Sequence, residues 1–380
     1  MKPLISITER STTATLVNGR IRTCDVVDCQ SRWNSAASDR VSSEPVLADG
    51  QVSAGTTIEP EDLAEKAARL RDMLLDLGEG LRITDLQLGL RDVAVAIRPG
   101  QQDERSFANR EFIFEVEVQR TIGRSSLLGS SYLYAPTLDG IDPSDILTTV
   151  TFPLRSEGYT NPPAAPRTDV VFGPPVMASL LENLVYSELM EHPQFVPDAT
   201  VSVCDRPQMP GSVAVHPVDD TGCPTRDVTL YGPGPVSSVE SRYFVPARSF
   251  QRKLFSDLTK HPTNIVITGP QADSSSLLTE IERGIYIHLI VGNHNCQGNV
   301  IEGTVFNSFA IDNGILGRAL RPFHIKINKR DLLPSIHALG TDIRTLRPFP
   351  WWSPVVIHTP TVFCRGLRIN HPFEDGKENK

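Results

Sequence analysis

The sequence is poor in the features that mark secreted and membrane proteins. Its six cysteines are scattered, with no CxxC pair and no regular spacing, which favours free thiols in a reducing compartment over a disulfide framework. No stretch approaches the ~20 apolar residues that a membrane-spanning helix needs. Residues 1–20 lack the apolar run of a signal peptide. We therefore expect a cytoplasmic protein.

Positive charge and complete catalytic motifs are also lacking. The formal net charge is −8, so the chain as a whole does not attract nucleic acid or an anionic membrane surface. There is no GxGxxG after a strand, no Walker loop, no GxSxG elbow and no HExxH. Taken alone, the chain carries no complete catalytic or metal-binding constellation.

What is present is the composition of a multidomain globular protein. The 380 residues are 39% hydrophobic and 22% charged, and this length exceeds what one hydrophobic core usually serves. We predict an α+β fold, with a small N-terminal α/β unit followed by a larger, mostly antiparallel β-sheet domain with a few helices. The predicted parts are a hairpin-plus-helix domain (1–79), a middle antiparallel sheet with a proline-rich linker (80–165), a C-terminal domain (166–373) and a disordered tail (374–380).

The N-terminal prediction depends on local patterns. Residues 4–33 alternate as strands do around Asn18-Gly19, a strong hairpin signal. A helix is predicted from Pro60, with leucines and alanine at three- and four-residue steps up to Leu77 and Gly78 at its end. In the middle unit, residues 111–119 alternate strictly between Glu or Gln and Phe or Val. This alternation predicts one buried and one solvated face of an antiparallel sheet.

The C-terminal part reads as many short strands with two helices among them. One helix is predicted over residues 176–192, and another over residues 329–340. Pro334 fits the first turn of the second helix if that helix begins near Asp331.

Several polar residues can be read in two ways. His294 and Cys296 can supply two metal ligands on a loop, but no third ligand is readable nearby, so a polar turn is the favoured interpretation. Glu188 and His192 are four residues apart on the predicted helix, where an ion pair or a solvated face is favoured over a site.

Two adjacent pairs also leave alternatives open. Asp219-Asp220 can be a carboxylate pair, although a turn cap is favoured. Trp351-Trp352 either packs in the core or a subunit interface, which is favoured, or forms a pocket wall.

Six segments stand out in a fixed order: Val17–Ile21, Asp205–Gly211, Asp219–Pro224, Ser241–Tyr243, Glu282–Ile287 and Ile311–Ile315. With these segments the sequence resembles the TldD/PmbA family over nearly the whole chain, most recognisably from residue 166 onward. The resemblance implies a three-part architecture and a heterodimer. One subunit, TldD-like, holds a metal through an HExxH-type helix and a later cysteine, and the TldE-like subunit lacks that site.

Carried over onto this sequence, the resemblance places the metal ligands at Glu182, Ser187 and Leu346, and the general base at Asn183. None of the four residues is of the required type, so this chain is similar to the metal-free TldE/PmbA-like subunit. No metal and no catalytic residue are expected in the chain, and zinc is expected in the partner.

These inferences lead to two main hypotheses. In the first, the chain is the non-catalytic subunit of a TldD/TldE-type metallopeptidase or amide hydrolase acting on a peptide or small amide. Its Arg347, Trp351, Trp352 and His294 then help to bind substrate beside an HExxH-bearing partner. The divergence of the sequence further suggests a natural-product, modified-peptide or antibiotic biosynthetic pathway. In the second hypothesis, the chain is a non-enzymatic binding or scaffold protein that kept the fold. A third and weaker alternative is a new site built from His294, Cys296 or His358.

Overall fold

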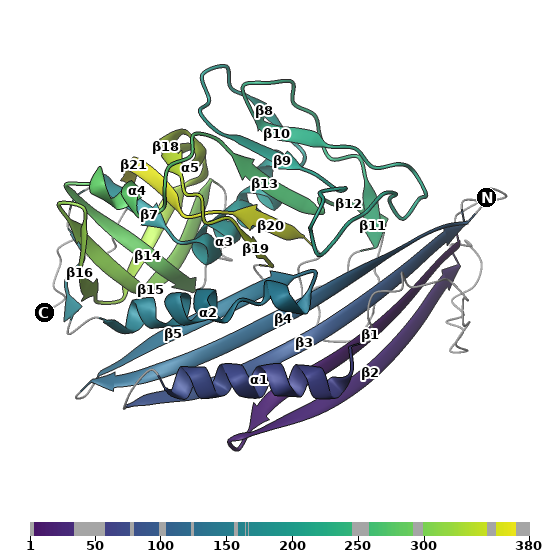
Figure 1. The fold of residues 1–380 in the computed structure, drawn as a ribbon. Helices are drawn as coiled ribbons and strands as arrows, with labels where there is room; N and C mark the ends of the chain where they lie inside the picture. Colours follow the sequence, from purple (N-terminus) through teal and green to yellow (C-terminus); the bar gives the residue numbers. More distant parts are fainter. Residues whose placement is uncertain are drawn as a thin grey trace, which may run out of the picture.

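Sheets dominate the computed structural model of the chain (Figure 1). Strands hold 51% of it and helices 21%, which confirms the expected α+β class. The structure describes residues 4–33, 58–76, 80–98, 104–122, 125–155, 159–163, 165, 167–244, 258–291, 299–347 and 355–369. The helices of this described part include none that is long and apolar enough to cross a membrane.

A five-stranded antiparallel sheet forms the N-terminal part, in the order β2-β1-β3-β4-β5. Its strands are β1 (Leu4–Val17), β2 (Arg20–Trp33), β3 (Leu81–Arg98), β4 (Arg105–Ile122) and β5 (Ser125–Ala135). Asn18 and Gly19 join β1 to β2 with φ of 50° and 76°. Two consecutive residues with positive φ are typical of a type I′ hairpin turn, so the predicted hairpin is confirmed.

The helix α1 (Pro60–Leu75) covers one face of this sheet (Figure 1). At its start the Asp62 carboxylate accepts from the backbone N–H of Glu59 over 3.1 Å. The apolar positions of α1 are fully buried against side chains of β3 and β4: Leu63, Ala67, Leu70 and Leu74 pack with Leu86, Leu88, Phe112 and Phe114. The predicted helix is confirmed up to Leu75, whereas Leu77 and Gly78 lie outside the described residues.

The sheet crosses the boundary that the sequence placed near residue 79. β1 of the hairpin pairs antiparallel with β3 from Leu4↔Arg98 to Thr15↔Gln87, so strands from both expected N-terminal parts share one sheet. An isolated two-stranded hairpin is only marginally stable in water, and pairing with β3 satisfies the backbone groups along one edge of it. The helix α2 (Pro143–Thr151), with a 3-10 turn on either side (Leu138–Gly140 and Phe152–Arg155), joins the same core through Ile146 and Val150.

Two larger sheets build the C-terminal part. An eight-stranded sheet has the order β18-β21-β7-β14-β15-β16-β6, with β17 also paired to β15. Its strands are β6 (Tyr159–Thr160), β7 (Arg167–Phe172), β14 (Arg283–Val291), β15 (Val300–Asp312), β16 (Ile315–Leu320), β17 (Phe323–Asn328), β18 (Ile336–Leu339) and β21 (Val362–Arg368). Most neighbours are antiparallel, but β7 runs parallel to β14 and β6 runs parallel to β16.

The second sheet has six strands in the order β19-β20-β13-β9-β10-β8. They are β8 (Gln194–Phe195), β9 (Ser202–Asp205), β10 (Val228–Gly232), β13 (Asn264–Thr268), β19 (Arg344–Leu346) and β20 (Val356–Thr359). A short pair, β11 (Arg242–Phe244) and β12 (Leu258–Lys260), and a four-residue helix, α4 (Ser276–Thr279), complete this part. Buried side chains of both sheets share one core with the helices α3 (Pro174–Leu184) and α5 (Lys329–Ser335).

The prediction for the second C-terminal helix is wrong in its extent. α5 ends at Ser335, and the residues that follow it form the strand β18. Pro334 therefore lies in the last turn of α5 and not in the first. A proline at this point lacks the N–H that would bond to the carbonyl of residue 330, and its ring clashes with that carbonyl. The proline thus helps to end the helix after seven residues.

Candidate functional site

Two buried charges join the C-terminal domain to the N-terminal sheet. Arg347, which follows β19, donates from Nε to Glu111 Oε1 on β4 over 2.6 Å, and the two side chains are 7% and 4% exposed. Arg91 of β3 lies on the other side of the carboxylate, with Nη1 3.6 Å from Glu111 Oε2. An ion pair that is buried this deeply is screened little by salt, and removing one partner leaves an uncompensated charge. We call Arg347, Glu111 and Arg91, together with the nearby His216 and His358, the junction cluster.

Two histidines of the junction cluster are held neutral. Burial lowers the pKa of His216 to about 3, and the positive charge of Arg347 contributes. Burial and the same guanidinium lower the pKa of His358 to about 4. His216 lies edge-on to the rings of Phe107 and Tyr243, at centroid distances of 5.5 and 5.1 Å. At neutral pH neither imidazole adds positive charge beside Arg347.

The side chain of Asn264 organises the buried polar groups next to His358. Its Oδ1 accepts from Ser212 Oγ over 2.5 Å and lies 3.2 Å from His358 Nε2. Its Nδ2 donates to the carbonyl of Ala214 over 2.6 Å. Since Oδ1 is an acceptor, His358 carries its proton on Nε2, and Nδ1 accepts from Thr345 Oγ1 over 3.1 Å. Both nitrogens of His358 are engaged, so it is not free to act as a base.

The face of β4 toward the C-terminal domain carries a second titratable group. Glu115 is half-buried, and burial raises its pKa to about 7, with a further contribution from Asp85. Among the described residues, Glu115 Oε1 and the buried hydroxyl of Tyr134 have no hydrogen-bond partner. The alternation of residues 111–119 predicted a solvated face here. That prediction is wrong for Glu111, which is 3% exposed, because the C-terminal domain covers this part of the sheet.

The helix α3 crosses the C-terminal core and ends in an unusual turn. Gly173 precedes it and Pro174 begins it, where the missing N–H of proline costs no hydrogen bond. After Leu184 the chain continues as a π-helical turn (Val185–Leu189), and Met190 N donates to Val185 O over 3.0 Å. We call this segment the π-turn. Such turns are rare and occur frequently at functional sites.

The sequence of the C-terminal domain decides the family. Residues 165–371 match the family described as the PmbA/TldA metallopeptidase C-terminal domain, which is more than half of the chain. The chain belongs to the PmbA/TldD family. No curated protein matches the chain.

Solved structures share the fold of this PmbA/TldD-family chain. TldE from Thermococcus kodakarensis is 15% identical, with a TM-score of 0.76 over 97% of this chain and 96% of that one. A proposed modulator of a DNA gyrase from Thermotoga maritima is 15% identical, with a TM-score of 0.74 over the same shares. A proposed modulator of DNA gyrase from Bacteroides thetaiotaomicron is 14% identical, with a TM-score of 0.68 over 97% and 94%. At these identities the likeness shows the fold alone.

The positions to which the family resemblance assigns a metal do not fit one here. Glu182 is 7% exposed within α3, and Asn183 Nδ2 donates to the carbonyl of Ser179 over 3.0 Å. Ser187 lies in the π-turn with its side chain exposed. Leu346 is an apolar side chain, 3% exposed, in β19. Within the described ranges, no three His, Cys, Asp or Glu side chains are placed to hold a metal ion.

The other residues that the sequence singled out have different outcomes. Trp351, Trp352, His294 and Cys296 lie outside the described residues. Asp219 caps a turn as favoured, because its Oδ1 accepts from the backbone N–H groups of Thr221 and Cys223. Of the four substrate-binding candidates, only Arg347 is placed, and its Nε is already engaged by Glu111. A role of these four residues toward substrate stays a prediction.

Sequence reasoning missed the partners of Arg347. Glu111 is 236 positions away along the chain, and no local pattern joins the two residues. The available signal was the glutamate-rich face of β4, where a buried carboxylate requires a cation. That signal required knowing that another domain covers the face.

Proposed function

We propose that this chain is the non-catalytic subunit of a heterodimeric metallopeptidase or amide hydrolase of the PmbA/TldD family. One observation carries the proposal, namely the residues at the four positions where a catalytic member would hold its metal and base. Glu182, Asn183, Ser187 and Leu346 cannot supply the three protein ligands and the base that a hydrolytic zinc site requires. The metal, expected to be zinc, and the catalytic residues then belong to an HExxH-bearing TldD-like partner.

The packing around α3 supports a structural role for this helix. Leu180, Leu181 and Leu184 are buried, and α3 packs against β14, β19 and β20. The helix therefore builds the core and holds the π-turn. In the proposed complex this subunit shapes the cavity in which the partner hydrolyses a peptide or small amide. We place the complex in the cytoplasm, in a natural-product, modified-peptide or antibiotic biosynthetic pathway.

Co-expression with the HExxH paralogue from the same genome tests the proposal. We expect the two chains to co-elute in size exclusion and the complex to carry about one zinc per heterodimer. We expect this chain alone to carry none. Replacing the motif glutamate of the partner by glutamine should abolish hydrolysis without dissociating the complex, since this glutamate activates water and holds no subunit.

Two results would contradict the proposal. Stoichiometric zinc in the isolated, tag-free chain would show that it has a metal site of its own. A stable monomer that does not bind the paralogue would favour the alternative, a binding or scaffold protein.

Within an active complex, the Trp351→Ala variant tests whether this residue contributes to the substrate cavity. A kcat/KM within about twofold of wild type, less than ~0.5 kcal/mol of transition-state binding, would remove this residue from the site.

A further inference from the structure

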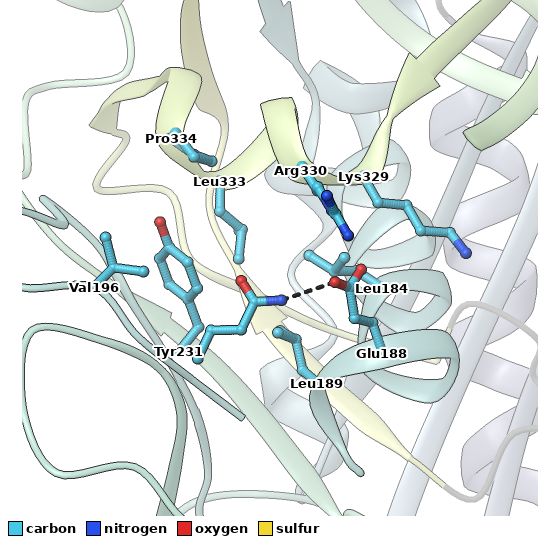
Figure 2. A pocket seen from close by; sticks show the side chains of 10 residues that line it. Leu184, Glu188, Leu189, Val196, Tyr231, Lys329, Arg330, Leu333 and Pro334 are labelled. Atoms are coloured by element: carbon cyan, nitrogen blue, oxygen red, sulfur yellow. Dashed lines mark hydrogen bonds between the residues drawn. The ribbon is translucent and has the colours of Figure 1, made fainter. Parts of the chain in front are cut away.

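A pocket of about 380 Å³ lies beside the π-turn, apart from the junction cluster (Figure 2). Three elements frame it: the end of the helix α3 with the π-turn, the paired strands β8 and β10, and the short helix α5. Its ten lining residues are Leu184, Glu188, Leu189, Gln194, Val196, Tyr231, Lys329, Arg330, Leu333 and Pro334. The volume is within the range of small-molecule sites, about 300–1,000 Å³.

Local structure explains why these side chains converge. Gln194 and Tyr231 are direct partners in the parallel β8–β10 pair, which puts their side chains on the same face of the sheet. In α5, Arg330 lies three and four residues before Leu333 and Pro334, so the three share one helix face. The side chain of Asn328 caps this helix by accepting from the backbone N–H of Arg330 over 2.9 Å.

One end of the pocket is apolar. Figure 2 shows Tyr231, Val196, Leu333 and Pro334 grouped on the side away from Glu188, and of these Tyr231 and Leu333 are each 3% exposed. Such a wall suits a compact apolar group, with the aromatic ring supplying much of the contact area.

The other end carries two opposite charges that are not joined. Glu188 accepts a hydrogen bond from Gln194 Nε2 over 2.9 Å (Figure 2), which leaves one carboxylate oxygen and the Gln194 carbonyl oxygen as acceptors. Arg330 has an exposed side chain. In the described part of the chain, neither Glu188 nor Arg330 makes an ion pair. Lys329 also lines the pocket, but its ammonium points away from Tyr231 in Figure 2.

We propose that this pocket binds a free α-amino acid with an apolar side chain. The ammonium group of the ligand fits Glu188 and the Gln194 carbonyl, its carboxylate fits the guanidinium fork of Arg330, and its side chain fits the leucine and tyrosine wall. A zwitterion matches the site because it brings one charge of each sign to two protein charges that do not pair with each other. Arginine suits the carboxylate because its planar donors can bind both oxygens.

This inference does not depend on the proposed function, since every residue in it belongs to this chain and none occupies a metal position. If Glu188 and Arg330 formed an ion pair with each other in the empty pocket, that pair would not prevent a ligand from binding. An ion pair at such an exposed position is worth only about 0–1 kcal/mol, which a ligand that makes two charge-assisted contacts can exceed.

Calorimetric titration of the full chain with L-leucine and L-phenylalanine tests the proposal. We expect saturable binding with a Kd between about 10 µM and 1 mM. Two half-ligands separate the charges, 3-methylbutylamine without the carboxylate and 4-methylpentanoate without the ammonium. Each should bind at least about tenfold more weakly than leucine, because each leaves one protein charge without its partner.

Variants assign the binding to this pocket. Glu188→Gln and Arg330→Gln should each weaken leucine binding at least about tenfold, whereas the exposed Arg318→Gln on β16 should leave it unchanged. Thermal unfolding checks that the variants remain folded. The proposal is overturned if no amino acid binds saturably, if binding survives both pocket variants, or if 4-methylpentanoate binds as well as leucine and Glu188→Gln has no effect. The last result would indicate a simple anion site.

Discussion

The junction cluster and the pocket beside the π-turn use the same two residue types in opposite ways. At the junction, Arg347 and Glu111 are in contact at 2.6 Å, with side chains 7% and 4% exposed. In the pocket, Arg330 and Glu188 line one cavity and do not pair. A closed and buried pair is committed to holding domains together, whereas an open pair beside an apolar wall can still receive a ligand. Whether a charged side chain stabilises the fold or binds a ligand therefore depends more on its burial and its pairing than on its residue type.

Breaking the ion pair between Arg347 and Glu111 is the strongest test of this comparison between the junction cluster and the pocket. Arg347→Ala leaves the Glu111 carboxylate buried with only the partly exposed Arg91 at 3.6 Å. We expect a loss of about 3–5 kcal/mol in the free energy of unfolding, the range for breaking a buried pair by removing one partner. Chemical denaturation of the isolated chain measures it.

The double variant Arg347→Met with Glu111→Leu is the control for this loss. Removing both charges together should recover a large part of the stability, because no uncompensated charge remains. If Arg347→Ala costs less than about 1 kcal/mol, the junction is solvated and the contrast with the pocket fails.

A smaller, pH-dependent effect is expected from Glu115 next to the junction. Burial raises its pKa from 4.5 to about 7, so the folded protein holds this proton more tightly than the unfolded chain. Its contribution to stability is therefore complete below about pH 4.5 and is lost as the pH rises through about 7. As the pH rises from about 4.5 to about 7, the free energy of unfolding of Glu115→Gln should increase relative to that of wild type by roughly 1–2 kcal/mol, allowing for partial exposure.

Denaturation of both proteins at several pH values measures this difference. Asp205, whose pKa burial raises to about 6, titrates in the same window. It is present in both proteins and cancels in the comparison. Parallel stability curves for wild type and Glu115→Gln would mean that Glu115 is as solvated in the folded state as in the unfolded chain.

The sequence predicted the elements of this fold better than their assembly. The Asn18-Gly19 hairpin and α1 follow from local turn chemistry and helical spacing, and both are confirmed. The joining of the hairpin to β3 could not be predicted, because strand pairing between distant segments leaves no local signal. The helix predicted over residues 329–340 is wrong in its extent for a local reason. The prediction places Pro334 at the start of the helix, whereas this proline helps to end it.

The candidate sites show the same limit. The sequence indicates Arg347 as a substrate-binding candidate, but its partner Glu111 lies on another sheet. For Glu188 the sequence indicates only a relation to His192 on the same predicted helix. Its neighbours in the pocket, Gln194 and Arg330, come from a strand and a helix that the fold brings together. Sequence spacing describes one element at a time, whereas both sites are made between elements.

A gain in stability is expected from Tyr134, which faces the junction from β5. Its buried hydroxyl has no partner among the described residues, so folding removes it from water without a compensating hydrogen bond. Tyr134→Phe keeps the ring and should stabilise the protein by about 0.5–1 kcal/mol. A destabilisation of similar size in thermal or chemical unfolding would show instead that the hydroxyl is hydrogen-bonded, for example to an ordered water.

The smallest effect on stability is expected for Glu188 and Arg330, which do not form an ion pair with each other. Glu188→Gln and Arg330→Gln should each change the free energy of unfolding by less than about 0.5 kcal/mol, the usual result for surface charges that form no ion pair. Both variants should nevertheless weaken amino-acid binding, which separates them from Arg347→Ala, where stability itself is lost. Denaturation without ligand and again with saturating leucine measures both quantities, because a ligand that binds only the folded state raises its stability. A loss above about 1.5 kcal/mol without ligand would mean that Glu188 or Arg330 already holds the fold together, and the distinction between the two regions would then be wrong.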